Sequence, residues 1–180
     1  MAATVFDPLG LLSPFLLKVK ILIQRLWTLK IDWDEEIEGV ELSQWKNWLK
    51  ELSEVELIKI LRCLKVSATS DITSVQLHVF SDASEDAFAV VAYTRMTDED
   101  GQHTVSLMMS RTRVTPLKQL SIVRLELQPA LLAVRLARAV QDELTCKFED
   151  VIFWTDSQVF FQFISNESRM FRDILSESSV

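Results

Sequence analysis

Two hydrophobic periods divide the chain into a helical first part and a mixed second part. In the first part, apolar residues recur every three or four positions over about residues 14–30 and again over about 42–52, which predicts two amphipathic helices. The pair Ser13 and Pro14 favours a helix start, with serine as the cap and proline at the first helical position. Residues 55–64 suit a helix or a strand, and we favour extended structure there.

Tryptophan is concentrated in this first part, which holds Trp27, Trp33, Trp45 and Trp48. Such rings could stack on nucleic-acid bases. Aromatic residues at helical spacing are more typical of a packed core, so we expect these rings to stabilise the helices.

The second part changes to the pattern of strands. Apolar and polar residues alternate over residues 75–81, whereas residues 151–155 are nearly all apolar, as expected of a buried central strand. The predicted elements are strands at about 75–82, 87–95 and 103–111 with a hairpin turn at 97–101, then a helix at about 123–144, a strand at about 151–155 and a helix at about 157–165. This order predicts a mixed α/β domain.

Small polar residues at 67–71 separate two apolar regions and favour a linker. We therefore predict a small helical unit over residues 1–66 and the α/β domain over 72–180. A chain of 180 residues, 48% of them hydrophobic and 25% charged, is long enough for one core and an appendage.

Three acidic residues are the candidate chemistry of the second part. Asp82 ends the first alternating strand, Asp156 follows the buried strand, and Glu126 lies in the first turn of the helix between them. Taken singly, each aspartate suits a turn or a helix cap. Together, the three carboxylates can converge on one point and supply the hard oxygen ligands that Mg²⁺ or Mn²⁺ prefers. They favour a two-metal site that cleaves phosphodiesters.

The charge of the chain is divided in the same way as its hydrophobic pattern. Residues 32–56 contain nine acidic residues and two lysines, so this segment alone carries a charge of −7, which equals the net charge of the whole chain. Residues 101–141 instead hold six basic residues and a single acid, Glu126. The basic residues are Arg111, Arg113, Lys118, Arg124, Arg135 and Arg138. On charge alone, this basic stripe suits a solvated surface and a phosphate-binding surface equally well.

Other classes of protein are disfavoured. Cys63 and Cys146 lie far apart without a paired motif, which excludes a zinc knuckle and a disulfide framework, and we expect both to be reduced core thiols. The apolar stretch over residues 9–23 is interrupted by serine, proline and two lysines and has no basic leader. We therefore expect no membrane partner and an intracellular protein that is not secreted.

Four motifs, in order along the chain, are similar to the Pao (BEL) retrotransposon polyprotein. They are FDPLGLLSPFLLKVKILIQRLW at 6–27, HVFSDASEDAFAVVAY at 78–93, SRTRVTPLKQLSIVRLELQPALLAVRLA at 110–137 and WTDSQVFFQFI at 154–164. The resemblance implies a remnant of the polymerase thumb or connection region, followed by a ribonuclease H-like fold. It also implies a location in a cytoplasmic particle or the nucleus.

The resemblance implies an activity and its residues. The implied activity is hydrolysis of the RNA strand of RNA–DNA hybrids, with Asp82, Glu126 and Asp156 holding two Mg²⁺ or Mn²⁺ ions. The rest of the retroelement polymerase is the implied partner, and the residues implied to contact nucleic acid are Arg111, Arg113, Lys118 and Arg124.

The chain also departs from this family. Ribonuclease H sites use a fourth acidic residue from a later helix, and the sequence ends at Val180 before that helix is complete. We therefore expect a C-terminally truncated domain whose own cleavage is weak or absent. The alternatives are a catalytically inactive nucleic-acid-binding or scaffolding remnant, and a fragment with no role.

Overall fold

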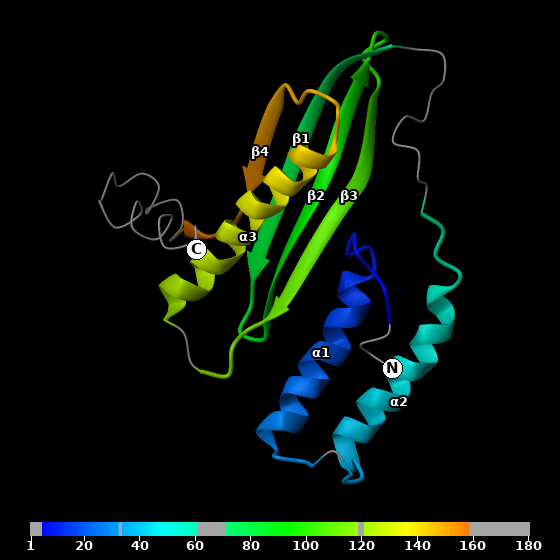
Figure 1. Ribbon diagram of the computed structural model, residues 1–180, viewed down its shortest axis with the longest axis vertical. Helices are drawn as coiled ribbons and strands as arrows, with labels where there is room; N and C mark the ends of the chain where they lie inside the picture. The colour runs from blue at the N-terminus through cyan, green and yellow to red at the C-terminus, as the bar shows by residue number, and fades with distance from the viewer. Residues whose placement is uncertain (1–4, 33, 61–70, 119–120, 159–180) are drawn as a thin grey trace.

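The chain folds into a four-stranded sheet with one long helix on one face and a pair of helices beside it (Figure 1). The computed structural model describes residues 5–32, 34–60, 71–118 and 121–158. In chain order the elements are α1 (Ser13–Thr28), α2 (Gly39–Val55), β1 (Ile72–Ala83), β2 (Ala87–Asp98), β3 (His103–Val114), α3 (Ile122–Glu143) and β4 (Asp150–Trp154). The mixed α/β fold predicted from the sequence is confirmed.

The sheet has the strand order β3-β2-β1-β4. The first three strands in sequence pair antiparallel, and β4 runs parallel to β1. Among the described residues β4 lies at the edge of the sheet, and Phe153 and Trp154 are exposed, so the prediction of a buried central strand there is wrong. The strands are longer than predicted, since β1 begins three residues earlier and β2 and β3 each end three residues later. An ordered turn closes the β2–β3 hairpin. In that turn the Asp98 side chain accepts hydrogen bonds from the backbone N–H groups of Asp100 at 3.1 Å and Gln102 at 2.8 Å, and Gly101 takes a φ of 75°.

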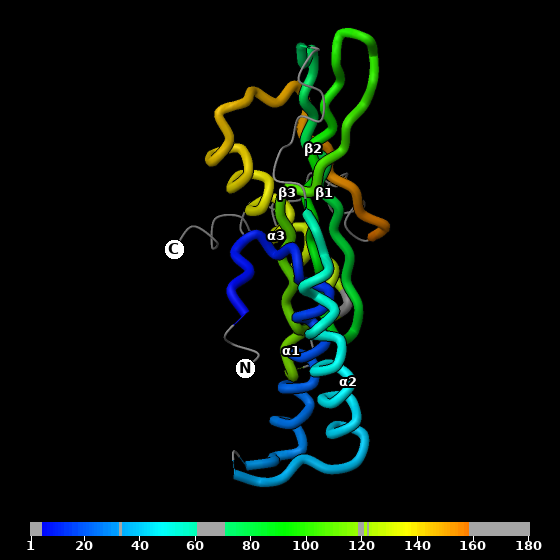
Figure 2. The backbone as a smooth tube through the Cα atoms, turned by 90° about the vertical axis from the view of Figure 1, so that its right-hand side faces the viewer, coloured from blue at the N-terminus to red at the C-terminus, as the bar shows by residue number. Residues whose placement is uncertain are grey.

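The main core lies between α3 and one face of the sheet. Leu77 and Val79 of β1 and Val90 of β2 are buried against Ala133 and Leu136 of α3. Side chains alternate across a strand, so the even-numbered residues of β1 point to the opposite face, which we call the open face. Figure 2 shows α3 on only one side of the sheet.

The predicted helix at 123–144 is confirmed as α3, and it begins one residue earlier. The Ser121 side chain caps it by accepting a hydrogen bond from the Arg124 N–H at 3.4 Å. Pro129 lies inside α3, and the helix continues through it. A proline inside a helix has no N–H to donate, so α3 lacks one backbone hydrogen bond at this position.

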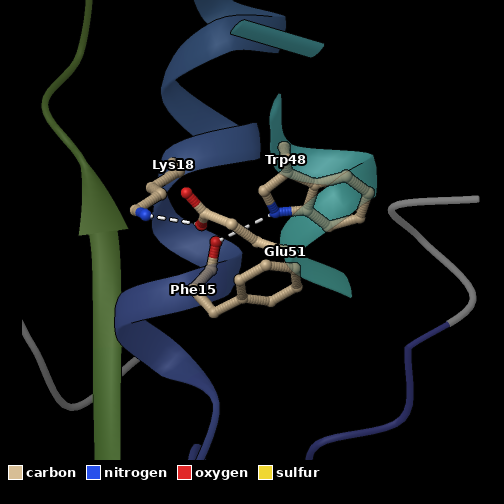
Figure 3. Close-up of polar contacts among 4 residues, drawn as sticks. All are labelled: Phe15, Lys18, Trp48 and Glu51. Atoms are coloured by element: carbon tan, nitrogen blue, oxygen red, sulfur yellow. Dashed lines mark hydrogen bonds and ion pairs between the residues drawn. The ribbon is translucent and has the colours of Figure 1, made fainter. Parts of the chain in front are cut away.

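A second, smaller core joins α1 and α2. The Trp48 ring stacks on Phe15 at a centroid distance of 4.9 Å and on Trp45 at 5.3 Å, and its Nε1–H donates to the Phe15 carbonyl at 3.2 Å (Figure 3). Lys18 and Glu51 form an ion pair at the rim of the same contact, at 2.6 Å (Figure 3). The expectation that the tryptophans serve a core is confirmed for Trp45 and Trp48.

The other two tryptophans of this part are Trp27 and Trp33. Trp27 is exposed near the end of α1, and Trp33 lies outside the described residues. Helix α2 ends at Val55, and residues 58–60 are neither helix nor strand. The rest of the predicted extended segment, residues 61–64, falls outside the described part of the chain, as does the predicted helix beyond residue 158.

Residues 5–12, which we call the N-terminal arm, connect the helical pair to the sheet. The Ser110 N–H of β3 donates to the Leu9 carbonyl at 2.8 Å, and the Ser110 hydroxyl donates to the Gly10 carbonyl. Arg111 donates to the Pro8 carbonyl at 2.8 Å. The predicted linker at 67–71 lies almost entirely outside the described residues, so the domain boundary there stays a prediction.

The start of α1 differs from the predicted serine cap. Ser13 is the first residue of the helix, and Leu12 occupies the cap position without a side-chain hydrogen bond. Instead, the Asp7 carboxylate accepts from the Leu11 N–H at 2.9 Å and the Leu12 N–H at 2.8 Å. The acidic side chain therefore satisfies the amides just before the helix. No helix in the described residues is both long and apolar enough to cross a bilayer.

Candidate functional site

Asp82 and Asp156 lie at the same end of the sheet because β1 and β4 run parallel. Asp82 is the penultimate residue of β1 and pairs with Ala89 of β2. Asp156 follows shortly after the end of β4. Both aspartates are exposed, and both line one cavity of about 600 Å³. The structure therefore brings together two of the three predicted carboxylates.

Glu126 lies at the same end of the molecule but in the helix layer. It precedes the buried residues Ala130 and Ala133 by one and two helical turns, which places it on the side of α3 that faces the sheet. Helix α3 covers the face that carries Val79, whereas Asp82 points to the open face. Glu126 is not among the residues that line the cavity.

The expectation of one metal-sized cluster of three carboxylates is not met in the described residues. They contain no group of three or more His, Cys, Asp or Glu side chains placed to hold a metal ion. The physical reason is the strand alternation, which directs the two aspartates away from α3. The catalytic and metal-binding roles of Asp82, Glu126 and Asp156 stay predictions.

The cavity that contains the two aspartates also holds three aromatic side chains, which sequence reasoning missed. Phe80, Tyr93 and Trp154 line it on the open face, and Gly10 and Pro14 belong to its wall on the α1 side. The sequence did carry a signal for it. The aromatic residues at 80 and 154 precede the aspartates at 82 and 156 by two positions, and residues two apart on a strand share a face.

The aromatic rings of the cavity contact one another. Trp154 stacks on Phe80 at a centroid distance of 5.8 Å and on His78 at 6.1 Å, and Phe80 meets Tyr93 edge to face at 6.0 Å. Trp154 Nε1–H donates to His78 Nδ1 at 3.1 Å. Because Nδ1 accepts, the neutral His78 ring carries its proton on Nε2.

Two buried polar atoms of this region have no hydrogen-bond partner among the described residues. They are Thr112 Oγ1 and His78 Nε2. Thr112 lines the cavity, next to Ala89 in the β2–β3 register. A buried hydroxyl without a partner costs free energy, so it favours a bound group that supplies a hydrogen bond.

The four residues implied to contact nucleic acid are all exposed. Arg113 lies near the end of β3, Lys118 follows that strand, and Arg124 lies in the first turn of α3. Strand β3 ends at the same end of the sheet as β1, since both pair antiparallel with β2. These three cations are therefore at the end of the sheet that carries the aspartates. Arg111 instead holds the N-terminal arm through Pro8.

Cys146 is a free thiol that is partly buried rather than in the core, and Cys63 lies outside the described residues, so its predicted state stays a prediction.

Comparisons with known proteins were made on sequence and on structure. The family model described as "Pao retrotransposon-like RNaseH-like domain" matches residues 1–157. No curated protein matches the chain. A solved structure of the foamy viral protease-reverse transcriptase dRH in complex with double-stranded DNA aligns at 16% identity with a TM-score of 0.40, over 99% of this chain and 32% of that one. This likeness is too low to support an argument, and the chain spans about a third of that structure's length.

Proposed function

Because the chain belongs to the Pao retrotransposon-like RNaseH-like domain family, we propose that it is a nucleic-acid-processing segment of a retrotransposon polyprotein. Its proposed reaction is hydrolysis of the RNA strand of RNA–DNA hybrids, carried out together with the rest of the polymerase inside the cell. The observation that supports this proposal is the position of Asp82 and Asp156, whose side chains line one cavity at the ends of neighbouring parallel strands.

The two aspartates suit a hydrolytic site by their chemistry. Both carboxylates are exposed, and neither forms an ion pair with another described residue. They are thus available as hard oxygen ligands, and Mg²⁺ or Mn²⁺ is the cofactor we propose. The described residues do not by themselves fit a complete two-metal site, because Glu126 lies on the other side of the sheet.

The exposed cations at the same end of the sheet suit a phosphate backbone. Arg113, Lys118 and Arg124 are free of the contact that holds Arg111 to the N-terminal arm. Each lysine or arginine that neutralises a phosphate increases the dependence of affinity on salt. We therefore propose that these three residues position the hybrid and that the aspartates act at its cleaved bond.

A second function is favoured by the missing three-carboxylate group. In this alternative the chain binds nucleic acid or acts as a scaffold within the polyprotein, and it cleaves nothing. The basic residues would then retain their role, and Asp82 and Asp156 would have none in catalysis.

A cleavage assay separates the two functions. A labelled RNA–DNA hybrid is incubated with Mg²⁺ and either the polyprotein that contains this chain or the chain alone, as wild type, Asp82→Asn or Asp156→Asn. Asp142→Asn, an exposed residue of α3, is the matched control for the same loss of charge. We expect the polyprotein to cut the RNA strand and the chain alone to cut weakly or not at all.

The size of the expected effect follows from the role of the carboxylates. Loss of a carboxylate that would hold the metal ion removes part of the stabilisation of transition-state charge that the ion would supply, which costs several kcal/mol, or more than about a hundredfold in rate. Asp82→Asn and Asp156→Asn should show this loss in the polyprotein, and Asp142→Asn should not. Full cleavage by both variants would refute the proposal, and hybrid binding without cleavage by the wild type would establish the alternative.

A further inference from the structure

We propose that the aromatic cavity on the open face binds an unpaired nucleobase of the nucleic acid held at this end of the sheet. This inference deepens the proposed function, on which it rests, by assigning a ligand to the cavity next to Asp82 and Asp156.

The surface of the cavity suits a flat aromatic ligand. Phe80 and Trp154, which line it, are 41% and 48% exposed although they are large apolar side chains. Bases stack on such rings whatever their sequence, because every base has a π-face. The volume of about 600 Å³ lies in the range of pockets that enclose small organic ligands.

The main ring of the cavity is held in position before any ligand binds. Trp154 is fixed by its hydrogen bond to His78 at 3.1 Å and by stacking between His78 and Phe80. A side chain that is already ordered loses little conformational entropy on binding. The ring is therefore a preorganised platform rather than a mobile surface residue.

The polar groups of the cavity match the edge of a base. Thr112 lines the cavity, and its buried Oγ1 lacks a hydrogen-bond partner among the described residues, so the hydroxyl can still bond a ring nitrogen or carbonyl. The carboxylates of Asp82 and Asp156 are acceptors for the exocyclic amino groups of adenine, guanine or cytosine. A purely aliphatic ligand would leave the Thr112 hydroxyl without a partner.

A basic peptide is the other ligand that the aspartates alone would suit, because cations are attracted to both carboxylates and aromatic faces. The nucleobase is favoured by the unpartnered Thr112 hydroxyl. A base offers a ring nitrogen or carbonyl to which this hydroxyl can donate, whereas a lysine or arginine side chain offers no acceptor.

Binding of a fluorescently labelled oligodeoxyadenylate to the full chain tests the inference. This single-stranded DNA is not a substrate of the proposed RNA hydrolysis, so its affinity is measured by fluorescence anisotropy in Mg²⁺ whether or not the chain cleaves hybrids. Trp154→Ala should weaken binding by about fivefold to more than a hundredfold, which is the loss expected for one stacked base. Trp154→Phe, which keeps a ring, should retain most of the affinity.

Trp27→Ala is the matched control, since Trp27 is an exposed tryptophan of α1 that does not line the cavity. It should bind as tightly as the wild type. A backbone of the same length without bases should bind more weakly than the oligodeoxyadenylate and should not distinguish Trp154→Ala from the wild type. Circular dichroism and thermal melting confirm that each variant is folded.

Equal affinity of the wild type and Trp154→Ala for the oligonucleotide would overturn the inference. So would an oligolysine peptide that binds through Trp154 while the oligonucleotide does not. Base binding by a chain whose polyprotein fails to cleave hybrids would leave the nucleobase site in place and refute the hydrolytic function alone.

Discussion

Gly10 is the residue on which the attachment of the N-terminal arm depends. Its φ is 73°, and a Cβ atom added there would lie 2.0 Å from the Ser110 carbonyl oxygen and 2.7 Å from the Ser110 carbonyl carbon. Both atoms belong to the backbone of β3, which is paired with β2 and cannot give way. In Gly10→Ala the arm must therefore leave the strand.

The cost follows from the contacts that the arm makes. Three hydrogen bonds join it to β3: Ser110 N–H to Leu9, the Ser110 hydroxyl to Gly10, and Arg111 to Pro8. At about 0.5–1.5 kcal/mol each, their loss lowers the free energy of unfolding by about 1.5–4.5 kcal/mol. Two glycines provide matched controls.

Gly39 and Gly101 have φ values of 64° and 75°, and nothing lies within 4 Å of an added Cβ at either position. Alanine there should cost only the left-handed backbone strain, about 1–2 kcal/mol. Urea unfolding measures the three free energies. Amide hydrogen exchange adds a local measurement, because the Ser110 N–H should lose its protection in Gly10→Ala and keep it in Gly39→Ala and Gly101→Ala.

The reasoning is refuted if Gly10→Ala costs no more than Gly101→Ala and the Ser110 amide stays protected. That result would mean that a Cβ atom fits at position 10 and that the arm stays bound to β3.

Three further predictions concern the helices. Trp48→Ala should lower the free energy of unfolding by about 3–5 kcal/mol, because the residue is only 3% exposed. Trp27 is 65% exposed, so Trp27→Ala should change that free energy by less than about 0.5 kcal/mol. Equal values from urea titrations of the two variants would show that the Trp48 ring stack is not a core. Lys18→Ala should cost less than about 1 kcal/mol, since Lys18 and Glu51 are 60% and 43% exposed, and a large loss that disappears in high salt would contradict this. Ser121→Ala should cost about 1 kcal/mol as the loss of an N-cap, and unchanged thermal melting would show that the 3.4 Å bond contributes nothing.

Most elements of the fold were predictable because their hydrophobic periods are unambiguous. The alternation before Asp82 and the helical spacing after Glu126 predicted β1 and α3, and the confirmed order of elements followed from them. The ends of the elements were less predictable. Asp7 satisfies the amides before α1 in place of the expected Ser13, because a side chain several residues away reaches them.

The candidate site was predictable in part. Asp82 and Asp156 lie at one end of the sheet and line one cavity. Their nearness was predictable, because each follows an apolar run that is typical of a strand. The position of Glu126 relative to that face depends on which side of the sheet α3 covers, and the sequence of the helix does not contain that information. The contact of Gly10 with Ser110 also left no side-chain pattern, because it is made mostly by backbone atoms.

The contact between the N-terminal arm and β3 also sets an order of folding events. Ser110 and Gly10 are 100 residues apart in the chain, and Arg111 and Pro8 are 103 apart. The β2–β3 hairpin closes over a short turn, and the entropy cost of closure rises with loop length, so the strand forms before the arm docks on it. Pulsed hydrogen exchange during refolding should therefore protect the amides paired between β2 and β3 before that of Ser110, and simultaneous protection would contradict this order. On the ribosome the arm emerges first, yet it has no strand to dock on until residues 110 and 111 have been synthesised.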